Sequence, residues 1–479
     1  MIDNLPKEVL LDIFDCYRQY FKYGLNYDEK AWNGIDGWFR LAHVCPKWRY
    51  VVLASPARLD LKLFITAKTP IKMAIAKGLP FLPIFINYTT GNWTTRDRER
   101  VLVALKYSGR VQGIALRGQN NDMGRVLKAM NRKFPALEIL ELINTGVLDL
   151  NLTSTFLWGS APQLRRLELC GVPSTFLAKL LSSTTSLLDL SLRKIDLGPS
   201  RTALLLTHLQ DMPCLCRLEL QLERVSRNDA ISPRTKGKDN VTLANLTYFH
   251  FSGPGASLEV LLAGLSAPSL QDFHIALHDT TPTFLLPHVP RFICDVEEVS
   301  VALIFFSIRS FRISMHNNYR PYDHSPFEIL IPRNRDSITE LGDALSTKFA
   351  TVEDLLLLLT WYPVPGQGWL FEEPILWHGF FRQFSGAKIL RVQRELVLEI
   401  AYFLRSDDRG PILDTLPALE KIELLSVGLT REYSMESLCT SALDIFKPFV
   451  AARQRAGRPV DVFWNMDYLK SLPLPKSGW

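Results

Sequence analysis

Leu164-Arg165-Arg166-Leu167-Glu168-Leu169 is the stretch that decides the fold, because its apolar residues stand at the first, fourth and sixth positions. The same arrangement is found at Leu137–Leu142 (LEILEL) and at Leu215–Leu220 (LCRLEL). Alternate side chains of an extended strand point to opposite faces, so the fourth and sixth positions share one face. Each copy therefore predicts a β-strand with a leucine-rich face in the core.

Further copies of this pattern follow one another along the chain. Successive first positions of the first eight copies are 23 to 31 residues apart, which is close to the period of leucine-rich repeats, roughly 20–29 residues. The first positions are Val111, Leu137, Leu164, Leu187, Leu215, Leu246, Leu270, Val296, Val352, Ala387 and Leu419.

Prolines mark the start of several copies, as in Ala161–Leu164 (APQL) and Ala267–Leu270 (APSL). A proline ends the preceding helix and leaves its neighbour extended, so that a strand can begin. We predict helices between strands, for example over 175–182 and 258–265. Further strands are predicted over 59–64, 82–87 and 460–464, and a strand pair, 308–313 with 327–331, around 317–326.

The predicted fold class is α/β. Residues 57–470 resemble an irregular leucine-rich-repeat domain, with parallel strands on a concave face and helices outside. The family's asparagine ladder is missing, because the ninth positions of successive copies are Thr145, Val172, Ile195 and Glu223. We expect insertions at about 224–240 and 302–350, and a C-terminal tail over 471–479.

The first fifty residues have a different character. In Leu5-Pro-Lys-Glu-Val-Leu-Leu-Asp-Ile-Phe14, Pro6 suits the first position of a helix, and Glu8 suits its first turn. Apolar residues at helical spacing follow, and Pro46 opens another short helix. A unit of this size closes only a small core. Its apolar surface is expected to be covered by a partner or by the rest of the chain.

This segment resembles the F-box, and the resemblance covers roughly residues 3–56. It implies a three-helix unit that docks a Skp-type adaptor of a cullin–RING ubiquitin ligase. A stretch over about 18–37 is longer than the usual link, and similar insertions occur in F-box proteins of mushroom-forming fungi. The matching residues are Leu5, Pro6, Glu8, Val9, Leu10, Ile13, Phe14, Val44, Cys45, Trp48 and Arg49. All except Arg49 are predicted to bind the adaptor.

Composition is that of an ordinary globular protein. A chain of 479 residues is too long for one compact core, so several domains are expected. Of its residues, 47% are hydrophobic and 22% are charged. The net charge of +6 is small for this length, and seven scattered cysteines favour a reducing compartment. The N-terminus does not look like a signal peptide, and the most apolar run, Val299–Ile308, is too short to span a membrane. We expect a cytoplasmic or nuclear protein.

Catalytic signatures are absent from the sequence, including phosphate-binding loops, nucleophile elbows and zinc-protease motifs. Cys214 and Cys216 are too close together for a zinc pair, and the repeat places His274 of the pair His274/His278 on a strand. We therefore predict no catalytic residue, no metal ligand and no cofactor. An enzyme with an unrecognised site remains a rival hypothesis.

The repeat predicts a ribbon of outward-facing side chains from its third, fifth and seventh positions. Its charges are mixed in sign, so either neighbouring strands neutralise one another or the ribbon binds a partner carrying both charges. Nucleic acid is disfavoured, because a phosphate track needs clustered Lys and Arg. The candidate target-binding residues are Glu141, Arg166, Glu168, Arg193, Arg217, Glu219, Tyr248, His250 and His274.

Three other stretches are candidates for contact with partners. Residues 224–240 are basic and read either as a localisation signal or phosphate contact, or as a solvated loop. Residues 361–381 are rich in aromatic side chains, which either contribute to an interface with a partner or pack in the core. The loop 314–326 is the third candidate.

The F-box resemblance and the repeat together imply a non-catalytic substrate receptor of an SCF-type ubiquitin ligase. Its partners would be the adaptor with its cullin–RING ligase and an unknown protein target. No membrane partner is expected, and the chain is expected to be monomeric apart from the complex. The alternatives are a repeat scaffold without a ubiquitination role and a nucleic-acid or phosphoinositide binder that uses the basic stretch.

Overall fold

The computed structural model divides the chain into two compact units. Unit 1 holds residues 1–196 and 207–215, and unit 2 holds 197–206 and 216–479. The predicted domain boundary at residues 56/57 stays a prediction. The residues that the structure describes are 5–23, 37–67, 82–89, 93–146, 156–159, 161–197, 199–223, 240–278, 288–293, 299–307, 310–317, 325–332, 335–359, 375–393, 396–397, 400–401, 404, 415–425 and 435–465.

Three helices begin unit 1: α1 (Lys7–Tyr23), α2 (Gly37–Val44) and α3 (Pro46–Leu53), and the first and third begin near Pro6 and at Pro46, as the sequence predicts. Helix α1 continues six residues into the stretch expected to be an insertion, and residues 24–36 lie outside the described part. Helix α3 starts with a proline, and the Cys45 sulfur accepts a hydrogen bond from the Trp48 amide. Cys45 is thus the N-cap of α3.

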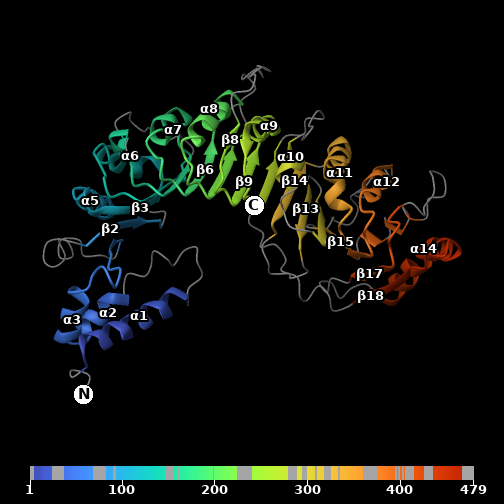
Figure 1. The fold of residues 1–479 in the computed structure, drawn as a ribbon, viewed down its shortest axis with the longest axis horizontal. Helices are drawn as coiled ribbons and strands as arrows, with labels where there is room; N and C mark the ends of the chain where they lie inside the picture. Colours follow the sequence, from blue (N-terminus) through green and yellow to red (C-terminus); the bar gives the residue numbers. More distant parts are fainter. Residues whose placement is uncertain are drawn as a thin grey trace. The chain divides into compact units, whose positions relative to one another are not determined.

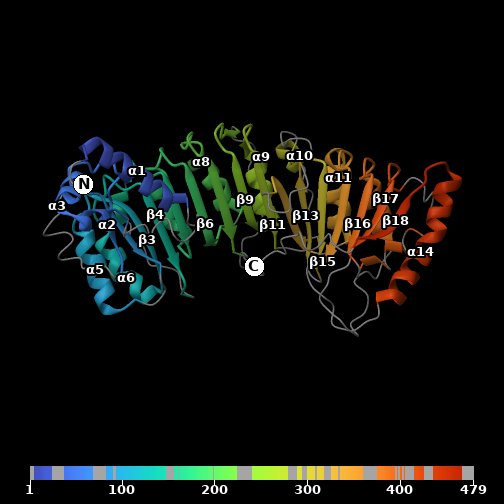
Figure 2. The ribbon, with the colours of Figure 1, turned by 90° about the horizontal axis from the view of Figure 1, so that it is seen from below.

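Parallel strands form the rest of unit 1. Each strand pairs with the next in chain order, from β1 to β6. Figure 1 shows the helices between them on one face of the strands, and Figure 2 shows the strands side by side. The strands are β1 (Leu63–Ile65), β2 (Ile84–Tyr88), β3 (Val111–Gly118), β4 (Ile139–Asn144), β5 (Arg166–Cys170) and β6 (Asp189–Ile195). The helices are α5 (Thr95–Leu105), α6 (Asn120–Ala129), the 3-10 helix η3 (Phe156–Gly159) and α7 (Ser174–Leu181).

The register follows the repeat. Leu140, Leu167 and Leu190, the fourth positions of three copies, lie side by side in β4, β5 and β6, and all are buried. Strands β4 to β6 begin at the third position of their copies. The eighth position makes the turn: Asn144 accepts a bond from the Gly146 amide at 2.9 Å, and Gly171 has φ +65°. These residues stand next to the expected asparagine ladder position.

The strands of unit 2 depart from chain order. The order is β7-β9-β11-β14-β13-β12-β15-β16-β17-β18, and β13 is antiparallel to both neighbours. The strands are β7 (Arg217–Leu222), β9 (Tyr248–Gly253), β11 (Asp272–Leu277), β12 (Val301–Phe306), β13 (Ser310–His316), β14 (Phe327–Pro332), β15 (Asp354–Leu359), β16 (Ile389–Gln393), β17 (Lys421–Leu425) and β18 (Asp461–Asn465), beside the short pair β8 (Val241–Thr242) and β10 (Leu265–Ser266).

Helices of unit 2 also lie on one face of its strands, as α9, α11 and α12 show in Figure 1. Helix α8 (Pro199–Leu209) is divided between the two units. The remaining helices are α9 (Gly255–Gly264), α10 (Val289–Ile293), α11 (Arg335–Phe349), α12 (Ile375–Arg382) and α14 (Met435–Arg455).

The region around β12 corrects the predicted frame. The sequence pattern places the copy at Val296/Val299/Val301, but Val301 pairs with Asp354, the third position of its own copy. The frame is therefore Val299/Ala302/Ile304, and all three side chains are buried. The predicted strand pair is confirmed as β13 and β14, although these strands are built into the main sheet.

Aromatic side chains fill the core of unit 2 between strands and helices. Phe273 stacks on Phe249 and Phe327 of neighbouring strands, with ring centroids 5.6 and 6.0 Å apart. Phe380 of α12 is 2% exposed and meets Phe311 of β13 edge to face. Phe380 belongs to the aromatic stretch 361–381, so this end of the stretch is core, while residues 360–374 lie outside the described part.

Candidate functional site

Helix α1 has one face in the protein core and one face exposed. Leu10, Leu11 and Phe14 are at most 5% exposed, whereas Val9 and Ile13 are 41% and 42% exposed. Val9 and Ile13 are four residues apart and lie on the same side of the helix. A pair of branched aliphatic side chains is therefore presented to the outside.

The helices α2 and α3 add to this exposed apolar surface. Val44 is 57% exposed at the end of α2, and Tyr50 is 71% exposed on α3. Sequence reasoning missed Tyr50, because its position falls outside the motif halves that carry the resemblance. We call Pro6, Val9, Ile13, Val44 and Tyr50 the exposed apolar set.

The ten residues predicted to bind an adaptor thus divide into three groups. Leu10 and Phe14 are buried within the chain, so their side chains hold α1 in place. Leu5, Cys45 and Trp48 are partly buried. The exposed members are Pro6, Glu8, Val9, Ile13 and Val44.

Specific contacts fix α1 against α3 and the residues that follow. The rings of Phe14 and Trp48 meet edge to face with centroids 4.9 Å apart, and the Lys47 ammonium donates to the Leu5 carbonyl at 2.8 Å. Arg58 pairs with Asp12 at 2.6 Å and with Asp15 at 3.3 Å. These contacts hold Val9 and Ile13 on the outward side of α1.

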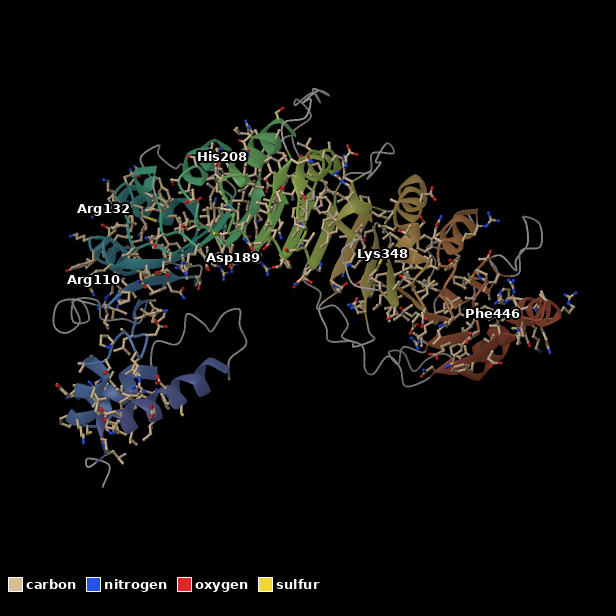
Figure 3. The ribbon with its side chains drawn as sticks, viewed as in Figure 1. Arg110, Arg132, Asp189, His208, Lys348 and Phe446 are labelled. Atoms are coloured by element: carbon tan, nitrogen blue, oxygen red, sulfur yellow. The ribbon has the colours of Figure 1, made fainter. Side chains whose placement is uncertain are left out.

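A second candidate surface is the sheet face turned away from the helices, here called the non-helical face. Figure 3 shows Asp189 of β6 on this side of unit 1 and Arg132 on the helical side. The third, fifth and seventh positions of each repeat occupy this face. The predicted target-binding residues are on it, four in unit 1 and five in unit 2.

In unit 1 these residues form a chain of ion pairs across β4, β5 and β6. Arg166 lies 3.3 Å from Glu141 and 3.7 Å from Glu168, and Arg193 lies 3.2 Å from Glu168. Burial raises the pKa of Glu141, and Arg166 opposes that rise. The neutralisation that the sequence allowed as an alternative is present here.

In unit 2 the predicted residues meet across β7, β9 and β11. The Arg217 guanidinium stacks 3.7 Å from the centre of the Tyr248 ring, and the Tyr248 and His274 rings are 5.5 Å apart. His250 and His274 are direct neighbours in the register, and Glu219 is beside His250. This region is the most aromatic part of the predicted ribbon.

Sequence reasoning missed a third charged group, on β15, β16 and β17. Arg391 forms ion pairs with Asp354 and, at 2.8 Å, with Glu423, and Lys421 lies 2.6 Å from Glu423. The Glu423 side chain is 4% exposed. The lysine and arginine contacts hold the pKa of Glu423 below its usual value although burial acts in the opposite direction. The third and fifth positions of these copies would have pointed to this group.

The same strands bury apolar side chains on the non-helical face. Leu356, Leu358 and Leu425 are at most 6% exposed, and Leu303 and Phe305 pack against them. Because Leu355 and Leu357 are also buried, β15 is covered on both faces. This part of the face is therefore interior.

Within the described ranges, no group of three or more His, Cys, Asp or Glu side chains is placed to bind a metal ion. Of the helices in those ranges, none is long and apolar enough to cross a membrane. Residues 224–239 of the basic stretch 224–240, residues 318–324 of the loop 314–326, and the whole of the tail 471–479 lie outside them.

A scan against protein-family models finds no match, and a search among curated proteins finds none. Among solved structures, the chain is similar to the leucine-rich repeat-containing protein LegL7 from Legionella pneumophila. That similarity has 11% sequence identity and a TM-score of 0.26, and it covers 81% of this chain and 97% of that one. The fold itself is mixed α/β with a large, mostly parallel sheet, which is compatible with a repeat solenoid.

Proposed function

We propose that this protein is a substrate-receptor subunit of an SCF-type ubiquitin ligase. Helices α1 to α3 would act as an F-box and bind a Skp-type adaptor. The repeat strands would hold a protein target, and the chain itself would carry out no bond chemistry. Such a receptor would work in the cytosol or nucleus, where the adaptor and the cullin–RING ligase act.

The exposure of Val9 and Ile13 carries this proposal. Single exposed apolar residues are ordinary, but several on one small helical unit mark an interaction site. The exposed apolar set includes four residues that match the F-box pattern, namely Pro6, Val9, Ile13 and Val44. The buried residues of the same pattern, Leu10 and Phe14, anchor α1, which presents Val9 and Ile13.

The proposed role needs no catalytic group on this chain. A receptor that holds a target beside a charged ubiquitin carrier converts a bimolecular encounter into an almost intramolecular step. The mixed charges on the non-helical face suit recognition of a protein surface. They do not suit a nucleic-acid backbone, which needs clustered cations.

The decisive experiment is adaptor capture by the full-length chain. The double change Val9→Asp with Ile13→Asp places two charges on the docking surface and is expected to lower capture at least about tenfold. Leu188→Asp is the matched control, because Leu188 is 37% exposed and lies elsewhere in unit 1. Unchanged capture by the double variant contradicts the proposal.

The main rival is a repeat scaffold that binds targets without delivering them for ubiquitination. Removing residues 1–56 separates the two roles. If the protein is a receptor, the truncated chain still binds the target but no longer shortens its lifetime. If it is a scaffold, target binding and target lifetime are the same with and without this segment.

A further inference from the structure

The non-helical face of β7, β9, β11 and β14 carries a group of side chains that we call the tyrosine–histidine strip. We propose that this strip binds a lysine or arginine side chain of a protein target. The inference rests on the proposed function, because it names the chemistry of the target that the repeat strands would hold. The strip consists of Arg217, Glu219, Tyr248, His250, Asp272, His274 and Glu328.

Ring faces form the centre of the strip. Tyr248 lies 5.5 Å from His274, and His250 lies 6.2 Å from His274, measured between ring centroids. A cation over an aromatic face is stabilised by the ring quadrupole, and arginine adds planar stacking. The chain already uses this preference, since Arg217 stacks 3.7 Å from the centre of the Tyr248 ring. The strip thus holds one guanidinium of its own in the manner proposed for the target.

Carboxylates surround these rings. The register places Asp272 beside Tyr248, Glu219 beside His250 and Glu328 beside His274. Together with burial, the three carboxylates raise the pKa of Tyr248, and Arg217 opposes them. Burial is the largest cause of that raised pKa, so the sign of the local charge comes from the residues themselves. Three carboxylates outnumber Arg217 and Arg312, which lies 3.3 Å from Glu328, and this excess favours a cation.

Partial exposure makes the strip reachable. Glu219, Tyr248, His250 and Asp272 are neither fully buried nor fully exposed, and Arg217 is exposed. A side chain entering here would lose part of its hydration, and cation–π contacts strengthen under that condition. An acidic or phosphorylated segment would instead meet three carboxylates.

The test uses the full-length chain and two short peptides of equal length, one containing arginine and one containing glutamate, each with a fluorescent label. Anisotropy is expected to show binding of the arginine peptide alone. The chain's net charge of +6 would repel a basic peptide in general, so binding must be local. The double change Glu219→Gln with Asp272→Asn is expected to weaken it about tenfold.

Two further variants separate the ring from the charge. Tyr248→Phe keeps the ring and should bind the arginine peptide nearly as well as the native chain, whereas Tyr248→Leu should lose most of the binding. Glu353→Gln removes one carboxylate of unit 2 outside the strip and should change nothing. Equal binding by the native chain and the double variant, or preference for the glutamate peptide, overturns the inference.

Adaptor capture, measured on the same preparations, distinguishes the two proposals. Variants that lose the arginine peptide but still capture the adaptor, and that keep the urea midpoint of the native chain, support the inference. If the native chain binds the peptide but captures no adaptor, the ligase role fails and the strip stands.

Discussion

Phe14 of α1 and Trp48 of α3 meet edge to face, with ring centroids 4.9 Å apart and planes inclined by 63°. This contact joins the two halves of the N-terminal motif, which are 34 residues apart in the sequence, and it orients α1 so that Val9 and Ile13 face outward. The exposed apolar set therefore depends on an aromatic contact between a buried ring, Phe14, and a partly buried one, Trp48.

Removing the Trp48 ring should loosen the three helices. Trp48→Ala is expected to cost about 2 kcal/mol, since it deletes a large side chain and an aromatic contact. Hydrogen exchange of the α1 amides should speed up, and adaptor capture should fall with it. Tyr50→Ala is the control for stability, because a side chain 71% exposed contributes little to folding. Unchanged exchange in Trp48→Ala would contradict this account of α1.

Gly386 is predicted to be intolerant of any side chain. A Cβ at this position would overlap the carbonyl oxygen of Ala350, a backbone atom that cannot move aside cheaply. Gly386→Ala should lower the free energy of unfolding by about 2 kcal/mol, as overpacking does. Gly379→Ala provides the contrast: its Cβ meets nothing within 4 Å, and it lies in α12, where alanine favours the helix. Urea denaturation should move the two midpoints in opposite directions.

Arg391 is predicted to be a structural arginine. Arg391→Leu leaves Asp354 and Glu423 without their guanidinium, and both carboxylate side chains are at most 14% exposed. The expected cost is about 3 kcal/mol, the range for breaking a buried ion pair. Lys388→Leu breaks an exposed pair with Glu353 instead and should cost far less, because solvent screens that pair. Similar costs for the two variants in urea denaturation would be incompatible with this assignment.

Two glutamates should give opposite dependences of stability on pH. Glu423 has a lowered pKa, so its contribution is present above the usual glutamate pKa and is lost as pH falls through its folded value. Glu141 has a raised pKa, so the native state is favoured at low pH, and this advantage is lost as pH rises through the raised value.

The check is a series of urea midpoints at acidic and neutral pH for Glu423→Gln, Glu141→Gln and the native chain. Glu423→Gln should differ most from the native chain near neutral pH, and Glu141→Gln should be the more stable relative to the native chain as pH rises. A common slope for all three proteins would contradict both pKa assignments.

The repeat pattern was sufficient to place most strands, because the fourth and sixth positions are buried wherever a copy is regular. The pattern was not sufficient around Val296, because the apolar residues there fit two frames, Val296/Val299/Val301 and Val299/Ala302/Ile304. Only the pairing of Val301 with Asp354 shows that the second frame is the right one. The order β14-β13-β12 could not be predicted either, because the spacing of apolar residues within a copy does not show which strand pairs with β11.

Helical periodicity also could not predict which apolar side chains of α1 are exposed. Leu10 and Ile13 are both apolar and three residues apart, yet Leu10 is buried and Ile13 is 42% exposed. Leu10 lies one turn before Phe14 on the same side of α1, and Phe14 meets Trp48, a residue distant in sequence. The network of Arg391 joins its own copy of the repeat to two others, those of Asp354 and Glu423, and the third and fifth positions of these copies could have pointed to it.

The reversed strand order around β13 has a consequence for synthesis. Strand β11 ends at Leu277, and its neighbour β14 begins only at Phe327, fifty residues later in the chain. During translation one edge of β11 keeps unpaired backbone N–H and C=O groups until these residues have been synthesised. The sheet therefore cannot grow by adding each new repeat to the one before it. A chaperone or the nascent chain itself has to shield that edge, and arrested chains ending before residue 327 should be prone to self-association.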